Sequence, residues 1–307
     1  MTTASAPAKA ILLGEHTALY GNPVLVMALE LRAHVNVSAR SDNEIRITAR
    51  DLGLEDTPAK RNQRGTALVR KAVELVGGGG FDIEIESDIP IAAGLGSSAS
   101  IASALLMALK AETGQESDMR EIAQEALECE NMVHQRSSGV DPFAVVYGGL
   151  CVYEKQNVEK LEVDEYPQIL VAHSGISSDT GDIVGDVEKV RSDDPERFKG
   201  FLEGSGKAVL EGKEAVQKGD WERLGKLMAG NHALLRGMGV SCAQLDDLVA
   251  AAREAGAYGA KLSGAGRGGI AIALVGENTK KPVSSALSSM GGKIIGSKIT
   301  QQGVRLE

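Results

Sequence analysis

The run Asp88-Ile-Pro-Ile-Ala-Ala-Gly-Leu-Gly-Ser-Ser-Ala-Ser100 decides the fold of this chain. It follows an alternating stretch, 81–87, that predicts a strand, and it enters a small-residue stretch, 99–111, that predicts a helix. Glycines let the backbone approach an anion, and the free N–H groups of a helix N-terminus attract negative charge. The run therefore predicts an anion site to which Ser97 and Ser98 add hydroxyl ligands for a phosphate or Mg²⁺. Taken alone, it is equally typical of a tight turn with a serine N-cap.

Composition restricts the class of protein. The chain has 307 residues, 43% hydrophobic and 24% charged, which suits a globular protein of two domains or one large domain. Aromatic residues make up only 3%, so we expect a core of aliphatic side chains and alanine. The net charge of −9 argues against non-specific binding to nucleic acid or to an anionic membrane.

The three cysteines, Cys129, Cys151 and Cys242, are an odd set without paired spacing, which predicts neither a disulfide framework nor a zinc site. Cys129 and Cys151 lie in apolar stretches and are expected in the core. The first residues show no secretory signal pattern, and no apolar run is long enough to span a bilayer. We therefore expect a cytoplasmic protein with no membrane partner.

Strand-like and helix-like patterns are mixed along the chain without strict β-α-β alternation, which favours the α+β class. Strands are predicted at 10–13, 24–37, 45–48, 81–87, 150–153, 169–173, 270–275 and 293–295. Helices are predicted at 65–76, 99–111, 118–134, 180–191, 195–216, 220–235, 241–255 and 283–290. The charged segment 154–165 is the expected boundary, which divides the chain into domains 1–155 and 156–307.

Three further segments carry side chains that can do chemistry. The first is Ala6-Pro-Ala-Lys-Ala-Ile-Leu-Leu-Gly-Glu-His16, in which Lys9 precedes a strand and Glu15-His16 follows it. A lysine beside a strand is more often simply solvated. Buried next to an acid, it would supply fixed positive charge to a reacting centre.

The second segment, 128–142, contains Glu128, Glu130 and Asp141. The two glutamates cannot both face the core, because residues two apart diverge on a helix. Glu130 is either a surface charge or a magnesium ligand. Asp141 lies in a Ser-Gly-Val-Asp-Pro turn, where aspartate is common for local hydrogen bonding, and its alternative role is to orient a hydroxyl.

The third segment, Lys261-Leu-Ser-Gly-Ala-Gly-Arg-Gly-Gly-Ile270, is a second glycine-rich loop before a strand. It is either a flexible hairpin or a second phosphate contact, and the presence of the first glycine loop favours the latter.

In this order and at these intervals, the segments resemble the signature motifs of the GHMP kinase superfamily, and the resemblance covers nearly the whole chain. It implies a two-domain α+β fold, with a ribosomal protein S5-like N-terminal domain (1–155), a ferredoxin-like α/β C-terminal domain (156–307) and an active site between them. The first motif is most similar to the mevalonate kinase branch. Ala18 stands where galactokinases carry a sugar-binding aspartate, which disfavours galactose.

The resemblance implies roles for individual residues, with ATP as phosphoryl donor, Mg²⁺ as cofactor and the C5 hydroxyl of mevalonate as acceptor. It implies that Asp141 and Lys9 are catalytic, that Ser98 and Glu130 hold Mg²⁺, and that Glu15, His16 and Thr180 contact the acceptor. It also implies that both glycine loops bind ATP, through Gly94, Leu95, Gly96, Ser97, Ser98, Ala99, Gly264, Ala265, Gly266 and Arg267. Related kinases are often homodimers.

Three positions depart from the superfamily pattern. Arg267 interrupts the glycine run and either clamps a phosphate or points to solvent; Ser263 replaces a threonine; and Pro142 removes a backbone donor after Asp141. These departures leave room for another acceptor, as in a phosphomevalonate kinase or a sugar kinase. A phosphorylated acceptor would need extra basic residues, for which Arg32, Arg136 and Arg191 are candidates.

Two other classes of protein are disfavoured. A non-catalytic sensor of ATP or a metabolite would be expected to lose the lysine, the metal ligands or the aspartate, and all are present. A dinucleotide-binding oxidoreductase would need a third glycine after Gly94 and Gly96 and a downstream acidic residue after a second strand.

Overall fold

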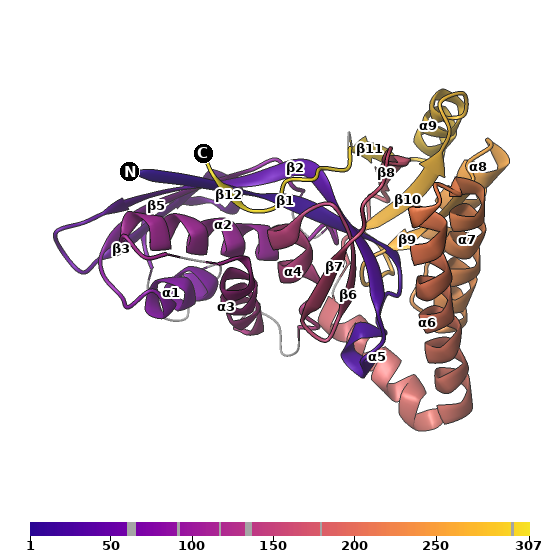
Figure 1. Ribbon diagram of the computed structural model, residues 1–307, viewed down its shortest axis with the longest axis horizontal. Helices are drawn as coiled ribbons and strands as arrows, with labels where there is room; N and C mark the ends of the chain where they lie inside the picture. The colour runs from indigo at the N-terminus through magenta and orange to yellow at the C-terminus, as the bar shows by residue number, and fades with distance from the viewer. Residues whose placement is uncertain (60–65, 91–92, 117, 133–136, 179, 296–297) are drawn as a thin grey trace.

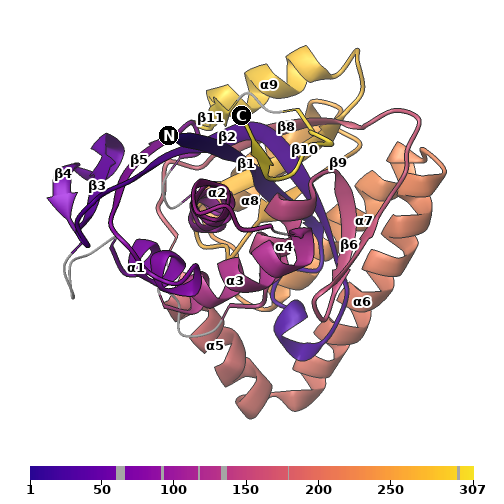
Figure 2. The same cartoon turned by 60° about the vertical axis from the view of Figure 1, so that its left-hand side comes forward.

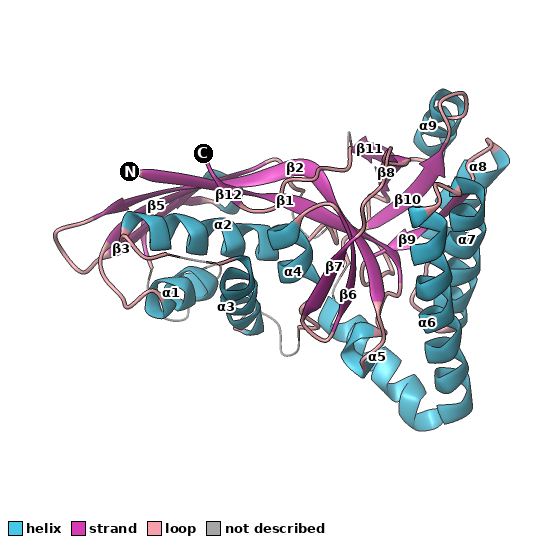
Figure 3. Cartoon of the chain, viewed as in Figure 1, coloured by secondary structure: helices cyan, strands magenta, loops and turns pink. Residues whose placement is uncertain are grey.

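The computed structural model describes residues 1–59, 66–90, 93–116, 118–132, 137–178, 180–295 and 298–307 (Figure 1). Within these residues the chain forms one sheet of eight strands and one of four, and helices cover both sheets (Figure 3). The α+β class predicted from the sequence is thus confirmed. No helix among the described residues has the length and apolar character needed to cross a membrane.

The first sheet has the order β12-β1-β2-β5-β3-β4, with β6 beside β2 and β7 beside β6. Its pairs are antiparallel except for β3 with β5. The strands are β1 (Thr2–Leu13), β2 (Val24–Ala39), β3 (Ile45–Ala49), β4 (Leu54–Pro58), β5 (Phe81–Ser87), β6 (Leu150–Glu154), β7 (Asn157–Lys160) and β12 (Arg305–Leu306). Two short 3₁₀ helices, η1 (Ala18–Tyr20) and η2 (Arg50–Leu52), lie between strands.

The second sheet is antiparallel, with the order β11-β8-β10-β9. Its strands are β8 (Gln168–His173), β9 (Gly259–Ser263), β10 (Ile270–Val275) and β11 (Lys293–Ile295). The helices are α1 (Thr66–Leu75), α2 (Ser97–Glu112), α3 (Met119–Asn131), α4 (Val140–Tyr147), α5 (Thr180–Asp193), α6 (Pro195–Gln217), α7 (Trp221–Gly237), α8 (Ala243–Glu254) and α9 (Lys280–Ser289).

The molecule has two lobes (Figure 1): the first contains the eight-stranded sheet with α1 to α4, and the second contains the four-stranded sheet with α5 to α9. The start of β2, 24–29, is buried on both faces because the two lobes meet across it. Val24 and Val26 belong to the core on the side of α2 and α4, whereas Leu25, Met27 and Leu29 belong to the core shared with the second sheet and α6. Successive side chains of a strand point to opposite faces, so a continuous apolar run serves both cores. In β10, Ile270, Ile272 and Leu274 likewise face the shared core, and Ala271 and Ala273 face α8 and α9.

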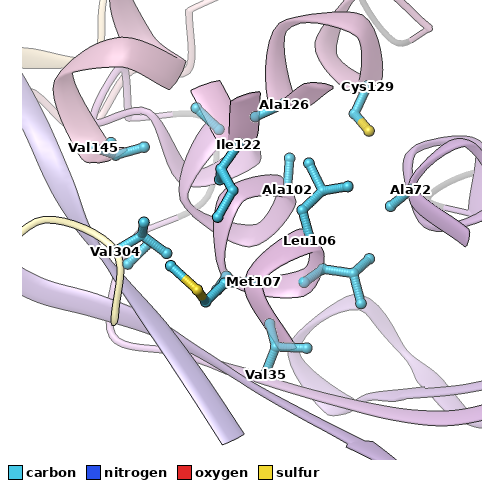
Figure 4. Close-up of a cluster of buried hydrophobic side chains, with 14 of the residues drawn as sticks. Val35, Ala72, Ala102, Leu106, Met107, Ile122, Ala126, Cys129, Val145 and Val304 are labelled. Atoms are coloured by element: carbon cyan, nitrogen blue, oxygen red, sulfur yellow. The ribbon is translucent and has the colours of Figure 1, made fainter. Parts of the chain in front are cut away.

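The helix α2 is the centre of the first lobe. It contacts β1, β2, α1, α3 and α4, and Figure 2 shows it surrounded by these elements. The core side chains labelled in Figure 4 are aliphatic, alanine or sulfur-containing, and the same core also includes the aromatic residues Phe81, Phe143 and Tyr153. Cys129 and Cys151 are buried, as expected, and their burial raises the pKa of each thiol to about 12.

Several helices begin with side chains that favour a helix start. Asp118, Asp194 and Asp220 are N-cap residues whose side chains accept hydrogen bonds from backbone N–H groups in the first turn, and Pro195 occupies the start of α6. Asp141 differs from the prediction of a turn, because α4 already begins at Val140 and Pro142 lies in its first turn. Proline is tolerated there since the N–H groups of a first turn have no intrahelical acceptor. The predicted end of α3 at residue 134 falls outside the described residues.

The strand β1 begins at Thr2, well before the predicted start at residue 10. Its first half, 2–7, consists of threonine, alanine, serine and proline, whose small side chains give little apolar signal, and it pairs with β2 on one side and β12 on the other. The division at residue 155 stays a prediction. Both β7 and β12 pair within the first sheet, so the chain returns to the first lobe at its end (Figure 1).

Candidate active site

A cleft of about 160 Å³ lies where the first lobe meets α5 and the loop between β9 and β10. Its walls come from segments far apart in the sequence. The lining residues are Lys9, Ile11, Gly14, Glu15, His16, Ala18, Leu19, Val24, Gly94, Glu130, Ser137, Ser138, Val140, Asp141, Thr180, Val184, Gly264 and Ala265.

Lys9 lies on β1 at the floor of this cleft. Its side chain is buried, and its Nζ lies 3.0 Å from Asp141 Oδ1 and donates to the carbonyl oxygen of Gly94 at 3.1 Å. Its backbone N–H donates to the carbonyl oxygen of Leu95 at 2.9 Å, which fastens the glycine loop to the strand. The alternative of a simply solvated lysine is therefore wrong.

The glycine loop ends in the N-terminus of α2. The N-cap residue is Gly96, with φ of 76°, and no side chain caps the helix, so the serine N-cap alternative is wrong. Neither Ser97 nor Ser98 forms a side-chain hydrogen bond with another described residue. Ser100, one turn further on, donates to the carbonyl oxygen of Pro7 at 2.7 Å and holds α2 against β1. The N–H groups of the first turn and two serine hydroxyls thus remain for a ligand.

Glu130, in the last turn of α3, is buried, and Ser137 donates a 2.8 Å hydrogen bond to its Oε2. Burial, together with the negative charge of Asp141, raises the pKa of Glu130 to about 8. Glu128 faces outward instead and pairs with Lys71 at 3.5 Å, so the two glutamates diverge as predicted. A buried carboxylate with a raised pKa beside a second carboxylate is well suited to a cation, which would compensate both negative charges.

Glu15 and Lys261 form a buried ion pair behind the cleft wall. Lys261 also donates to the carbonyl oxygen of Leu262 at 2.6 Å. Burial raises the pKa of Glu15 and lowers that of Lys261, and the opposite charge of each partner counteracts the shift. His16, at φ of 65°, lies with Nε2 2.9 Å from the carbonyl oxygen of Ala265, and burial lowers its pKa. The first motif therefore meets the third along this wall.

The two glycine loops touch. A Cβ built on Gly264 would lie 3.4 Å from Cα of Gly94, and Gly264 itself has φ of 92°. Ser263 accepts from the N–H of Ile11 at 2.8 Å and donates to its carbonyl oxygen at 3.0 Å, so β9 is fastened to β1. The hydroxyl at position 263 thus joins β9 to β1, and serine provides this hydroxyl as threonine would.

Nine of the predicted site residues line the cleft, namely Lys9, Glu15, His16, Gly94, Glu130, Asp141, Thr180, Gly264 and Ala265. Seven lie beyond its lining: Leu95, Gly96, Ser97, Ser98, Ala99, Gly266 and Arg267. Leu95 and Ala99 have buried side chains, so only their backbone is available to a ligand. Arg267 does not line the cleft; its side chain is 39% exposed, and its guanidinium pairs with Asp186 at 2.6 Å.

The sequence reasoning missed three residues of the site. Ser137 and Ser138 line the cleft between Glu130 and Asp141, and Lys261 holds Glu15. Small hydroxyl residues before a glycine gave no signal beyond a turn. The signal for Lys261 was a lysine among otherwise apolar residues of a strand, where a charge needs a buried partner.

Comparisons with known proteins agree with this arrangement. Two family models match: the GHMP kinases N terminal domain at residues 66–149 and the GHMP kinases C terminal domain at residues 213–293. A curated mevalonate kinase from Thermococcus gammatolerans is 39% identical over 328 aligned residues, which cover 99% of this chain and 98% of that protein.

Solved structures give the same picture. The crystal structure of L. major mevalonate kinase in complex with R-mevalonate matches with a TM-score of 0.80 and 28% identity, covering 97% of this chain and 96% of that one. The structure of Methanococcus jannaschii mevalonate kinase matches with a TM-score of 0.83 and 26% identity, covering 97% and 98%. The similarity thus extends over both lobes.

Proposed function

This chain belongs to the GHMP kinase family, and on that basis we propose that it transfers the γ-phosphoryl group of ATP to the C5 hydroxyl of mevalonate. Membership makes it an ATP-dependent kinase of a small molecule, and the full-length similarity to mevalonate kinases supports this acceptor. The observation that carries the proposal is the buried Lys9, whose Nζ contacts Asp141 and the carbonyl oxygen of Gly94 at once.

Phosphoryl transfer depends on in-line positioning and on charge neutralisation more than on covalent chemistry. In this proposal Asp141 accepts a hydrogen bond from the acceptor hydroxyl and takes its proton. Lys9 holds Asp141 through its 3.0 Å ion pair and stabilises the negative charge that develops between donor and acceptor. The loops at 94–99 and 264–267 lie against the ATP phosphates, which accept hydrogen bonds from backbone N–H groups other than that of Arg267. Glu15, His16 and Thr180 contact the acceptor.

We further propose that Glu130 and Ser98 hold Mg²⁺. The fit rests on oxygen donors and on the raised pKa of Glu130, which a nearby cation would lower again. When bound, Mg²⁺ neutralises charge on the phosphates. Ser137 keeps the Glu130 carboxylate in place through its 2.8 Å hydrogen bond.

The alternative of a phosphorylated acceptor gains no support from the arginines considered for it. Arg32 is buried and donates to Ser5 and to the carbonyl oxygen of Gly303. Arg191 pairs with Glu188 at 2.8 Å and lies over the ring of Tyr20. Arg136 falls outside the described residues.

The test is an ADP-release assay with mevalonate, phosphomevalonate and galactose as acceptors. We expect ATP- and Mg²⁺-dependent turnover with mevalonate, and mass spectrometry of the product should show one added phosphate. Turnover with one of the other acceptors but not with mevalonate would overturn the proposed acceptor, whereas no turnover with any of them would contradict the proposed reaction.

We also propose a domain division, an oligomeric state and a location. We divide the chain into domains 1–155 and 156–307, as the charged segment at the boundary suggests. A homodimer is proposed from the resemblance, and light scattering would test it. A cytoplasmic location agrees with three free cysteines, which are typical of reducing compartments.

A further inference from the structure

Arg267 connects the third glycine loop to helix α5. Its Nη1 donates to Asp186 Oδ2 at 2.6 Å, its Nε donates to the carbonyl oxygen of Gly239 at 3.1 Å, and its backbone N–H donates to the carbonyl oxygen of Val240 at 2.8 Å. The residue has φ of 52°, a conformation that glycine adopts without strain and arginine does not. The contacts of the side chain offset this strain, which points to a task for the arginine itself.

The segment that leads into α5 is fastened to the same loop. Ser178 donates to the carbonyl oxygen of Gly266 at 2.6 Å. The N–H of Gly269 donates to the carbonyl oxygen of Ile176 at 2.8 Å, and the N–H of Ser174 donates to the carbonyl oxygen of Gly269 at 2.8 Å. The loop and the entry to α5 therefore form one unit, and Asp186 extends this unit past the first turn of the helix.

Another side of α5, away from Asp186, lines the cleft. Thr180 and Val184, four residues apart and hence on one side of α5, both line it. Further along, Glu188 accepts a 2.7 Å hydrogen bond from the hydroxyl of Tyr20, which follows Glu15 and His16 in the sequence. The helix α5 thus bridges the third glycine loop and the first motif, over the end of the cleft at which the acceptor is proposed to bind.

We propose that Arg267 is a positioning residue that holds α5 over the acceptor through Asp186, so that the nucleotide loop and the acceptor site are coupled. This inference rests on the proposed function. Because the pair places α5 rather than touching the reacting atoms, its loss weakens acceptor binding and leaves the chemical step intact.

The variant Asp186→Ala tests the proposal, with Lys189→Ala as its matched control. Lys189 is the second partner of Asp186, at 2.8 Å, but it lies on α5 itself and makes no connection to the loop. Alanine is a strong helix former, so neither substitution weakens the helix through propensity. For a pair of this exposure we expect Asp186→Ala to raise the acceptor KM by about two- to five-fold, with kcat nearly unchanged. Lys189→Ala should match the wild type.

Two further measurements separate positioning from general damage. Hydrogen–deuterium exchange of residues 180–193 should accelerate in Asp186→Ala and not in Lys189→Ala. In a double-mutant cycle, Arg267→Ala should add little to the acceptor KM once Asp186 is alanine, because both substitutions remove one interaction.

Additive effects in the cycle, or equal effects of Asp186→Ala and Lys189→Ala, would overturn the inference. An unchanged acceptor KM in Asp186→Ala, with wild-type turnover of mevalonate intact, would overturn it while leaving the proposed function standing. If the wild type does not phosphorylate mevalonate, the proposed function fails, and the exchange measurement still decides whether the pair holds α5.

Discussion

The buried ammonium of Lys9 lies 3.0 Å from Oδ1 of Asp141 and 3.1 Å from the carbonyl oxygen of Gly94. One cation thus contacts both the carboxylate of α4 and the backbone of the glycine loop. The ammonium is buried, and the carboxylate of Asp141 beside it compensates for the loss of water around the charge. The same contact fixes the carboxylate at the cleft, so structure and proposed chemistry depend on one pair.

We therefore expect Lys9→Met and Asp141→Asn each to lower kcat by at least about 100-fold, since each removes a group assigned to the chemical step. Steady-state assays measure the loss, and calorimetry with a non-hydrolysable ATP analogue should show that Asp141→Asn still binds nucleotide. If neither substitution slows phosphoryl transfer, the assigned chemistry is wrong.

Lys110 provides the matched control for Lys9. Both side chains are 3% exposed, but Lys110 pairs with Glu121 and Glu125 between α2 and α3, and it does not line the cleft. Lys110→Met should lower the free energy of unfolding, because it removes the partner of Glu125, and should leave kcat within about two-fold of the wild type.

The second prediction concerns Gly96, the N-cap of α2. A Cβ at this position would lie 2.9 Å from Cγ of Lys9, so Gly96→Ala should displace the lysine. We expect a fall in kcat together with a loss of stability of about 1–2 kcal/mol from the positive φ. Activity assays and denaturant unfolding measure the two effects.

The variant Gly114→Ala separates the effect of a steric clash with Lys9 from the effect of backbone strain at a positive φ. Gly114 lies just beyond the other end of α2 and has φ of 73°, nearly that of Gly96, but a Cβ there would meet nothing within 4 Å. It should show a similar loss of stability with wild-type kcat. A comparable fall in kcat for both variants would contradict the role given to the space beside Lys9.

The third prediction concerns the buried pair of Glu15 and Lys261. Lys261→Met leaves a buried carboxylate without its cation, which costs about 3–5 kcal/mol. In Lys261→Met/Glu15→Leu both charges are gone, and the free energy of unfolding should recover by most of that amount. Urea unfolding of both variants measures the difference. A double variant no more stable than Lys261→Met would show that the pair is not the source of the loss.

Only part of the candidate site had a physical signal of its own in the sequence. Glycines with a helix start marked residues 94–98, whereas the role of Lys9 came from the resemblance to the GHMP kinase superfamily, because a lysine beside a strand is by itself more typical of a solvated side chain. The strict divergence of Glu128 and Glu130 followed from helix geometry alone and is confirmed. The local sequence pattern was sufficient to predict such features where they depend on a single loop or helix.

Contacts between distant segments were not predictable in the same way. The pair of Arg267 and Asp186 joins a loop to a helix, and the strand β12 returns to β1 at the end of the chain. Neither has a local signal, since an arginine in a glycine run and a two-residue strand fit many environments. The early start of β1 was missed for the same reason, because the small side chains of residues 2–7 give little apolar signal and are buried only by packing against distant segments.

The fourth prediction is a pH dependence of stability that arises at His232 of α7. The ring lies with Nε2 3.2 Å from Oδ1 of Asp246, and its Nδ1 accepts a 3.4 Å hydrogen bond from the N–H of Leu262. Burial, reinforced by the positive charges of Lys261 and Arg236 and opposed by Asp246, lowers the pKa of His232 to about 4. An acceptor at Nδ1 also requires that this nitrogen carry no proton.

The sign follows from proton uptake. Between pH 6.5, the ordinary histidine value, and about pH 4, the unfolded chain binds a proton at residue 232 that the folded chain does not. The free energy of unfolding therefore falls as the pH is lowered through this window, by up to about 3 kcal/mol from this group. Urea unfolding of the wild type and of His232→Gln at pH 5, 6 and 7 measures it. The variant should show a shallower slope than the wild type, and equal slopes would mean that another group causes the acid sensitivity.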